Sequence, residues 1–157
     1  MDMFRLNHEQ LLKGVNLSFQ RYLSRQVKWD RRLIGLFGAK GVGKTTLLLQ
    51  HIKSTYGDSH EALYLPLDNI WFQKRHMLSE TVRRFHEKGG RHLFLDNVHR
   101  YGNWIQAIER LHDDYPDMQI VFAAPSLVEG EKMEPSLGGK GDWYTLHTMS
   151  FREYLSY

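Results

Sequence analysis

Short apolar runs alternate along this chain with longer segments whose apolar residues recur at helical spacing. The apolar runs are typical of buried strands and lie at residues 33–37, 62–67, 92–96 and 119–123, with a fifth candidate at 143–147. Helical spacing covers residues 44–56, 76–88 and 104–113. Strands that alternate with helices are typical of a parallel sheet. The pattern therefore predicts an α/β protein with helices on both faces of one parallel sheet.

Two further segments and one proline complete the pattern. Residues 7–29 carry Leu11, Leu12 and Val15 at helix-like spacing and predict an amphipathic helix. We expect it to pack on the domain, and binding to a partner is the alternative. Pro66 suits a strand at the edge of the sheet, because proline cannot donate to a neighbouring strand. Residues 128–142 are rich in glycine and charge and predict a loop.

The composition narrows the class of protein. The 157 residues fit a single domain, residues 1–157, and contain no cysteine. The absence of cysteine excludes disulfides, thiolate zinc sites and a cysteine nucleophile. It also favours the reducing cytoplasm as the compartment of the protein. No signal peptide is evident, and no apolar run approaches the roughly 18 residues of a membrane span. The net charge of +3 is spread along the chain and does not by itself indicate nucleic acid as a partner.

The most specific motif follows the first predicted strand. Residues 38–45 read GAKGVGKT and satisfy the P-loop pattern G-x-x-x-x-G-K-[ST] in full. Glycines let successive backbone N–H groups line a phosphate nest, and the next helix directs its N-terminal dipole at the same anion. We expect Lys44 to reach the β- and γ-phosphates of ATP, and Thr45 to offer its hydroxyl to Mg²⁺. The candidate cofactor-binding residues are Gly38, Ala39, Lys40, Gly41, Val42, Gly43, Lys44, Thr45 and Thr46.

An aspartate ends the third predicted strand. A carboxylate at the C-terminal end of a central parallel strand lies in the ligand crevice, so Asp96 is the second candidate magnesium ligand beside Thr45. A structural cap is the alternative role for Asp96. The next residue, Asn97, stands where many P-loop ATPases carry a catalytic glutamate. An amide can orient water but cannot accept its proton. Lys44 and Asn97, the latter at a degenerate position, are the candidate catalytic residues. The sequence therefore supports ATP binding more strongly than ATP hydrolysis.

At this point the chain resembles the bacterial and archaeal AAA-like ATP-binding proteins whose ATPase domain precedes a C-terminal domain of unknown function. The resemblance covers nearly the whole chain. It rests on residues 41–48 (GVGKTTLL), 89–96 (GGRHLFLD), 99–104 (HRYGNW) and the more particular segment 150–155 (SFREYL). It implies a three-layer α/β/α P-loop sandwich of the additional-strand type. It also implies that the strand 119–123 lies between the strand of the phosphate loop and the strand of Asp96.

The chain departs from the family pattern at three places and in its length. Asn97 replaces the usual glutamate, and the fourth strand ends in Ala123-Ala124-Pro125-Ser126 instead of Thr-Gly-Ser-Ser. The arginine pair that usually precedes the fifth strand is replaced by Gly139-Lys140-Gly141-Asp142. All three positions are expected near the γ-phosphate, so we expect weakened hydrolysis. The sequence ends at Tyr157, where family members continue into a lid and a second domain, so we expect it to be the N-terminal ATPase part, as a fragment or as a shortened member.

Three functions remain open for such a domain. They are an ATPase or ATP-dependent switch for an attached or partner effector, a degenerate module that binds ATP with little hydrolysis, and a small-molecule kinase. A guanine-reading Asn-Lys-x-Asp motif is missing from the sequence, which disfavours a GTPase. The sequence leaves self-association into a homo-oligomer open, and neither a membrane nor nucleic acid is indicated as a partner. His8, His51, His86 and His112 fall among charged residues and are expected on solvated helix faces.

Overall fold

Five parallel strands form the centre of the molecule. The computed structural model describes residues 2–15, 26–39, 43–74, 76–125 and 140–146. The strands are β1 (Leu33–Phe37), β2 (Ala62–Pro66), β3 (His92–Asp96), β4 (Gln119–Ala124) and β5 (Asp142–Thr145). Their order is β2-β3-β4-β1-β5, and every pairing is parallel. β4 therefore separates β1 from β3, as the resemblance implies.

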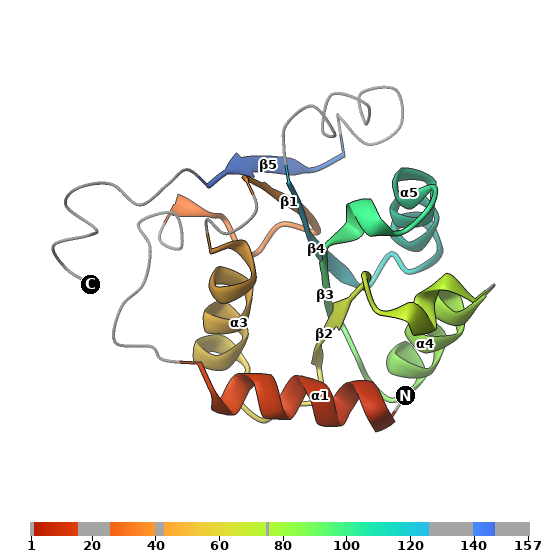
Figure 1. The fold of residues 1–157 in the computed structure, drawn as a ribbon, viewed down its shortest axis with the longest axis horizontal. Coiled ribbons are helices and arrows are strands. Elements are labelled where there is room, and N and C mark those ends of the chain that lie inside the picture. The colour runs from red at the N-terminus through yellow and green to blue at the C-terminus, as the bar shows by residue number, and fades with distance from the viewer. Residues whose placement is uncertain (1, 16–25, 40–42, 75, 126–139, 147–157) are drawn as a thin grey trace, which may run out of the picture.

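Helices cover both faces of the sheet, which confirms the predicted α/β/α sandwich. Figure 1 shows α3 (Lys44–Thr55) on one face, and α4 (Met77–Glu87) and α5 (Trp104–Asp114) on the other. Successive strand residues point to opposite faces, so in β1 Ile34 and Leu36 pack under α3 while Leu33 and Phe37 pack with the opposite layer. Two short 3₁₀-helices, η1 (Ile70–Gln73) and η2 (Val98–Arg100), follow β2 and β3. Within the described ranges, no helix is long and apolar enough to span a bilayer.

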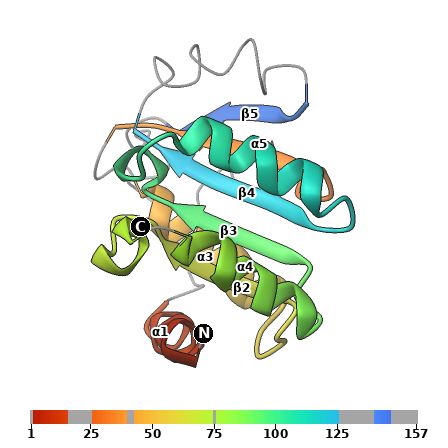
Figure 2. The same cartoon turned by 90° about the vertical axis from the view of Figure 1, so that its right-hand side faces the viewer.

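The first helix, α1 (Asp2–Lys13), lies against the outer edge of β2 and crosses the strand direction, as Figures 1 and 2 show. Two of its polar side chains bond the edge backbone that lacks a strand partner. Arg5 Nη1 donates to the carbonyl oxygen of Ala62 at 2.8 Å, and the backbone N–H of Tyr64 donates to His8 Nδ1 at 2.9 Å. These bonds satisfy polar groups that would otherwise be open to pairing with another chain. β2 is thus an edge strand, as Pro66 predicts.

The prediction of one helix over residues 7–29 is wrong at both described ends. α1 begins at Asp2 and ends at Lys13, and the backbone N–H of Gly14 turns back onto the carbonyl of Leu11. The stripe that α1 buries is Phe4, His8 and Leu12, at a spacing of four residues, while Leu11 is exposed. Phe4 stacks on Phe72 with ring centroids 4.8 Å apart, which anchors the helix at its N-terminal turn. Residues 16–25 lie outside the described part of the chain.

The expectation that the helical histidines are solvated is wrong for His8. Its side chain is 1% exposed, because it faces the edge of β2 instead of water. His51 is also partly buried, and its ring stacks on Trp29 with centroids 3.8 Å apart. Most of the predicted loop 128–142 lies outside the described residues. Its last residue, Asp142, begins β5, one residue earlier than predicted.

Candidate functional site

The phosphate loop connects the C-terminal end of β1 to the N-terminus of α3. Gly38 follows β1, and its N–H bonds the carbonyl of Ala124 at the end of β4. Gly43 immediately precedes α3, and its φ is 103°. Residues with a side chain rarely adopt this backbone conformation, which explains the need for glycine there. Lys40, Gly41 and Val42 lie outside the described residues. The described residues therefore place a strand before the motif and a helix after it, as the motif requires.

Lys44 and Thr45 form the first turn of α3. The Lys44 ammonium donates to the carbonyl oxygens of Gly38 and Ala39, within the loop itself. Burial lowers the pKa of Lys44, and the nearby Asp96 carboxylate opposes this shift. Thr46, the last of the predicted cofactor-binding residues, is exposed in the same turn.

Asp96 lies at the end of β3 and is 1% exposed. Its carboxylate accepts three hydrogen bonds from residues that the structure describes. Oδ2 accepts from the Thr45 hydroxyl at 2.5 Å and from the Tyr64 hydroxyl at 2.6 Å, while Oδ1 accepts from the backbone N–H of Asn97 at 2.9 Å. A buried carboxylate needs such donors, because an unpaired charge in the interior is costly. The fold thus brings together Thr45 and Asp96, the two residues predicted to bind a metal.

Tyr64 is a member of this cluster that the sequence reasoning missed. It extends from β2, where it pairs with Phe94, and its side chain is 3% exposed. Burial, followed by the Asp96 charge, raises the pKa of Tyr64, so the phenol remains a neutral donor. The signal in the sequence was a polar atom inside an apolar run. Its partner becomes evident only once β2 is known to lie beside β3.

Asn97 has a left-handed backbone conformation, with φ at 53° and ψ at 42°. Asparagine is enriched several-fold there relative to other residues with a Cβ. Asn97 therefore suits the turn that leads from β3 into η2, whatever its chemical role. Its partly buried side chain lies beside the end of β3, where the sequence placed it.

A cavity of about 430 Å³ opens between the phosphate loop and the ends of β2 and β3. Gly43, Lys44, Thr45, Thr46 and Asn97 line it, together with Asp68, His99, Arg100 and Pro125. His99 and Arg100 are exposed residues of η2 that the sequence reasoning did not single out for this site. Ala123 and Ala124 are fully buried in β4, so neither offers a polar side chain to the cavity.

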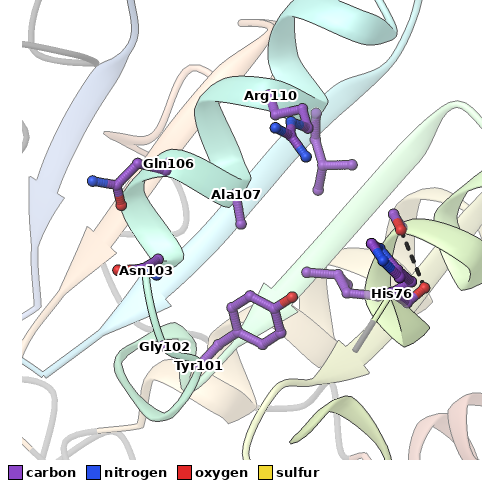
Figure 3. A pocket seen from close by; sticks show the side chains of 10 residues that line it. His76, Tyr101, Gly102, Asn103, Gln106, Ala107 and Arg110 are labelled. Carbon is purple, nitrogen blue, oxygen red and sulfur yellow. Dashed lines mark hydrogen bonds between the residues drawn. The ribbon is translucent and has the colours of Figure 1, made fainter. Parts of the chain in front are cut away.

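Size does not distinguish this cavity from the others. A groove of about 740 Å³ runs under α1, between Arg5, Lys13 and Lys53. A third cavity, of about 360 Å³, lies between α4 and α5. Figure 3 shows Gln106, Ala107 and Arg110 of α5 on one side of it and His76, at the start of α4, on the other. Of these three cavities between described residues, the one at the phosphate loop combines a P-loop lysine with a carboxylate and a hydroxyl at a helix N-terminus, so we favour it on chemical grounds.

The donors at this site suit a hard divalent cation. Mg²⁺ binds through oxygen, often with one or two carboxylates, and keeps several waters. Thr45 Oγ1 and Asp96 Oδ2 are adjacent oxygens of this kind; Thr45 lines the cavity, and Asp96 is bonded to Thr45 without lining it. Among the described residues, no group of three or more His, Asp or Glu side chains forms a separate metal site.

Comparison with solved structures supports the fold. AMPPCP-bound DnaA from Aquifex aeolicus is similar with a TM-score of 0.57 and 14% identity, over 94% of this chain and 47% of that one. A DNA replication initiation factor is similar with a TM-score of 0.54 and 15% identity, over 92% and 46%. The chain therefore spans less than half the length of these proteins. A comparison with curated proteins gave no match.

Family membership follows from the sequence as well. The AAA domain family matches residues 30–155, which include the phosphate loop, all five strands and the segment 150–155 on which the resemblance rested. The match covers well over half of the chain, and the sheet order and the structural similarities agree with it. The chain belongs to the AAA domain family of P-loop proteins.

Proposed function

We propose that this domain binds MgATP at the phosphate loop and serves as an ATP-dependent switch, or a slow ATPase, for an effector. The observation that carries the proposal is the contact between the Thr45 hydroxyl and the Asp96 carboxylate at the N-terminus of α3, beside Lys44. In P-loop proteins, a hydroxyl and an acidic residue in these positions hold the magnesium ion, and the lysine neutralises phosphate charge. Membership in the AAA family supports the same assignment.

In this proposal, each described residue of the site has a defined task. Lys44 exchanges its bonds to the loop carbonyls for bonds to the β- and γ-phosphates. Thr45 and Asp96 hold Mg²⁺, which when bound neutralises charge on the phosphates. Ala39 and Gly43, with Lys40, Gly41 and Val42, supply the backbone N–H groups, while the N–H of Gly38 joins the loop to the end of β4 and Thr46 completes the helix N-terminus.

The experiment compares wild type with Lys44→Ala by calorimetric titration of MgATP. Loss of a charge-assisted bond costs roughly 1.5–3 kcal/mol, so ATP affinity should fall about tenfold or more. Lys53→Ala is the matched control, because Lys53 lies at the opposite end of α3 and bonds the carbonyl of Val15. Equal affinities of wild type and Lys44→Ala would reject the proposed site.

A second candidate function is a module that holds ATP with little turnover, and Asn97 is the observation in its favour. The amide cannot take a proton from water, and the buried Ala123 and Ala124 cannot compensate for it. Positioned general bases contribute about 10²–10⁴-fold to rate. We therefore expect single-turnover hydrolysis by wild type to be slow at saturating MgATP.

The backbone of residue 97 determines how this candidate is tested. Because φ is 53°, Asn97→Glu carries a conformational strain of roughly 1 kcal/mol besides its new carboxylate. Asn97→Gln carries the same strain without a base and is the matched control. We expect the glutamate variant to hydrolyse ATP about tenfold or more faster than the glutamine variant. Fast single-turnover hydrolysis of ATP by wild type, or equal hydrolysis rates in the two variants, would contradict the role given to Asn97.

A further inference from the structure

Tyr64 is the buried polar side chain next to the proposed metal ligands whose role the proposed function leaves unexplained. Its hydroxyl donates to Asp96 Oδ2 at 2.6 Å, the same oxygen that accepts from Thr45. The two donors reach Asp96 from different elements, β2 and the first turn of α3. The backbone N–H of Asn97 holds the other oxygen, Oδ1. The carboxylate is thus held by donors on both of its oxygens.

A carboxylate has about four acceptor sites, and the three bonds from described residues occupy all but one of them, which would serve a metal ion or its water. Without the Tyr64 bond, the Thr45 hydroxyl would be the only side-chain donor to Oδ2 among the described residues. That hydroxyl is the group the proposed function assigns to Mg²⁺. The rotation of the carboxylate would then be fixed less firmly on the side where the metal binds. Groups that orient a metal ligand in this way commonly change metal affinity by about 10- to 100-fold.

We propose that Tyr64 is a positioning residue that holds Asp96 in the orientation needed for Mg²⁺. The inference rests on the proposed function, since it needs MgATP to bind at this site. Tyr64 does not line the cavity at the phosphate loop, so in this proposal it acts through Asp96 alone. Its ring packs in the apolar layer under α3, and only its hydroxyl reaches the site.

The placement of Tyr64 follows from the sheet order. β2 is an edge strand, and Tyr64 pairs with Phe94 of β3, two residues before Asp96. Residues two apart along a strand share a face, so Phe94 and Asp96 both face α3, as does Tyr64. The phenol therefore extends along the sheet toward the carboxylate from the neighbouring strand. α1 supports the same residue from outside, because His8 accepts the backbone N–H of Tyr64.

The test measures ATP affinity by calorimetry with Mg²⁺ and with EDTA, so that the metal-dependent part is separated from the rest. Tyr64→Phe keeps the ring and removes the hydroxyl. We expect it to lower the enhancement of ATP affinity by Mg²⁺ about tenfold, while affinity in EDTA stays within about twofold of wild type. Tyr56→Phe removes a hydroxyl at the far end of α3, from a ring in the same apolar layer, and should change neither affinity.

A double-variant cycle adds a measurement that a purely structural role would not affect. If Tyr64 acts through Asp96, Tyr64→Phe should have no further effect on the Mg²⁺ enhancement in an Asp96→Ala background. An unchanged enhancement in Tyr64→Phe, an equal loss with and without Mg²⁺, or additive effects in the double variant would each overturn the inference. Absence of ATP binding by wild type in both conditions would instead reject the proposed function, and the inference with it.

Discussion

The buried histidine of α1 gives the fold a dependence on pH that can be worked out from the structure. His8 Nδ1 accepts the N–H of Tyr64, which the ring can do only while that nitrogen is unprotonated. Burial, with smaller contributions from Arg5 and His60, lowers the pKa of His8 from 6.5 to about 4. Because the folded pKa lies below the unfolded value, the unfolded chain binds more protons between these two pH values. The contribution of neutral His8 to the free energy of unfolding is therefore complete above about pH 6.5 and is lost as the pH falls toward 4.

The magnitude follows from the size of the shift. A change from 6.5 to about 4 corresponds to roughly 3 kcal/mol of the free energy of unfolding. His8→Asn removes the titration and places an amide oxygen where Nδ1 lies, so the bond to Tyr64 can be kept. We expect wild type to lose roughly 3 kcal/mol more than this variant between about pH 7 and pH 4. His51 titrates in the same range, since burial and His92 also lower its pKa to about 4, but its contribution is common to both proteins.

Urea unfolding, followed by tryptophan fluorescence at several pH values, measures this difference. His76→Asn is the control, because His76 is exposed and has φ at 65°, which asparagine tolerates. The control should follow the pH dependence of wild type. If His8→Asn lost as much stability as wild type between these pH values, the assignment of the pH dependence to His8 would be wrong.

Two further predictions concern the sheet and the metal site. At Gly35, a Cβ would lie 2.7 Å from the ring of Trp143 and 2.8 Å from that of Phe122, so Gly35→Ala should lower the free energy of unfolding by roughly 1–3 kcal/mol, measured by denaturant titration. Gly102→Ala, where a Cβ has no neighbour within 4 Å, should be close to neutral. Asp96→Ala should reduce the Mg²⁺ dependence of ATP binding in a magnesium titration, and an unchanged dependence would return Asp96 to the role of a structural cap.

The sequence predicted the sheet well, for a physical reason. β1, β3 and β4 are buried on both faces, so each appears as a nearly continuous apolar run bounded by turn residues. The order of the strands came from the resemblance, because apolar runs carry no information about which strands are neighbours. Asp96 was identified because it stands at the C-terminal end of such a run.

What the sequence could not reveal depended on contacts between distant segments. The buried stripe of α1 contains a histidine, whose burial makes sense only once the edge of β2 lies against it. A search for apolar periodicity therefore favoured Leu11 and extended the helix past Gly14. Tyr64 was missed for the same reason, because its partner Asp96 is 32 residues away in the chain. In both cases a polar atom is buried next to one specific partner, and composition carries no signal for that.

Asn97 shows how the structure changes the meaning of a sequence difference. In the sequence, Asn97 stands where the family pattern usually has a glutamate, and an amide cannot act as a base. In the structure, the backbone N–H of Asn97 bonds Asp96 Oδ1, and its left-handed conformation directs the chain from β3 into η2. Asparagine meets both demands at little conformational cost, whereas a glutamate in the same conformation would be strained by roughly 1 kcal/mol. The residue thus supports the orientation of the proposed metal ligand while it lacks the chemistry of a base. Under the proposed function, this combination favours binding of MgATP over its rapid hydrolysis.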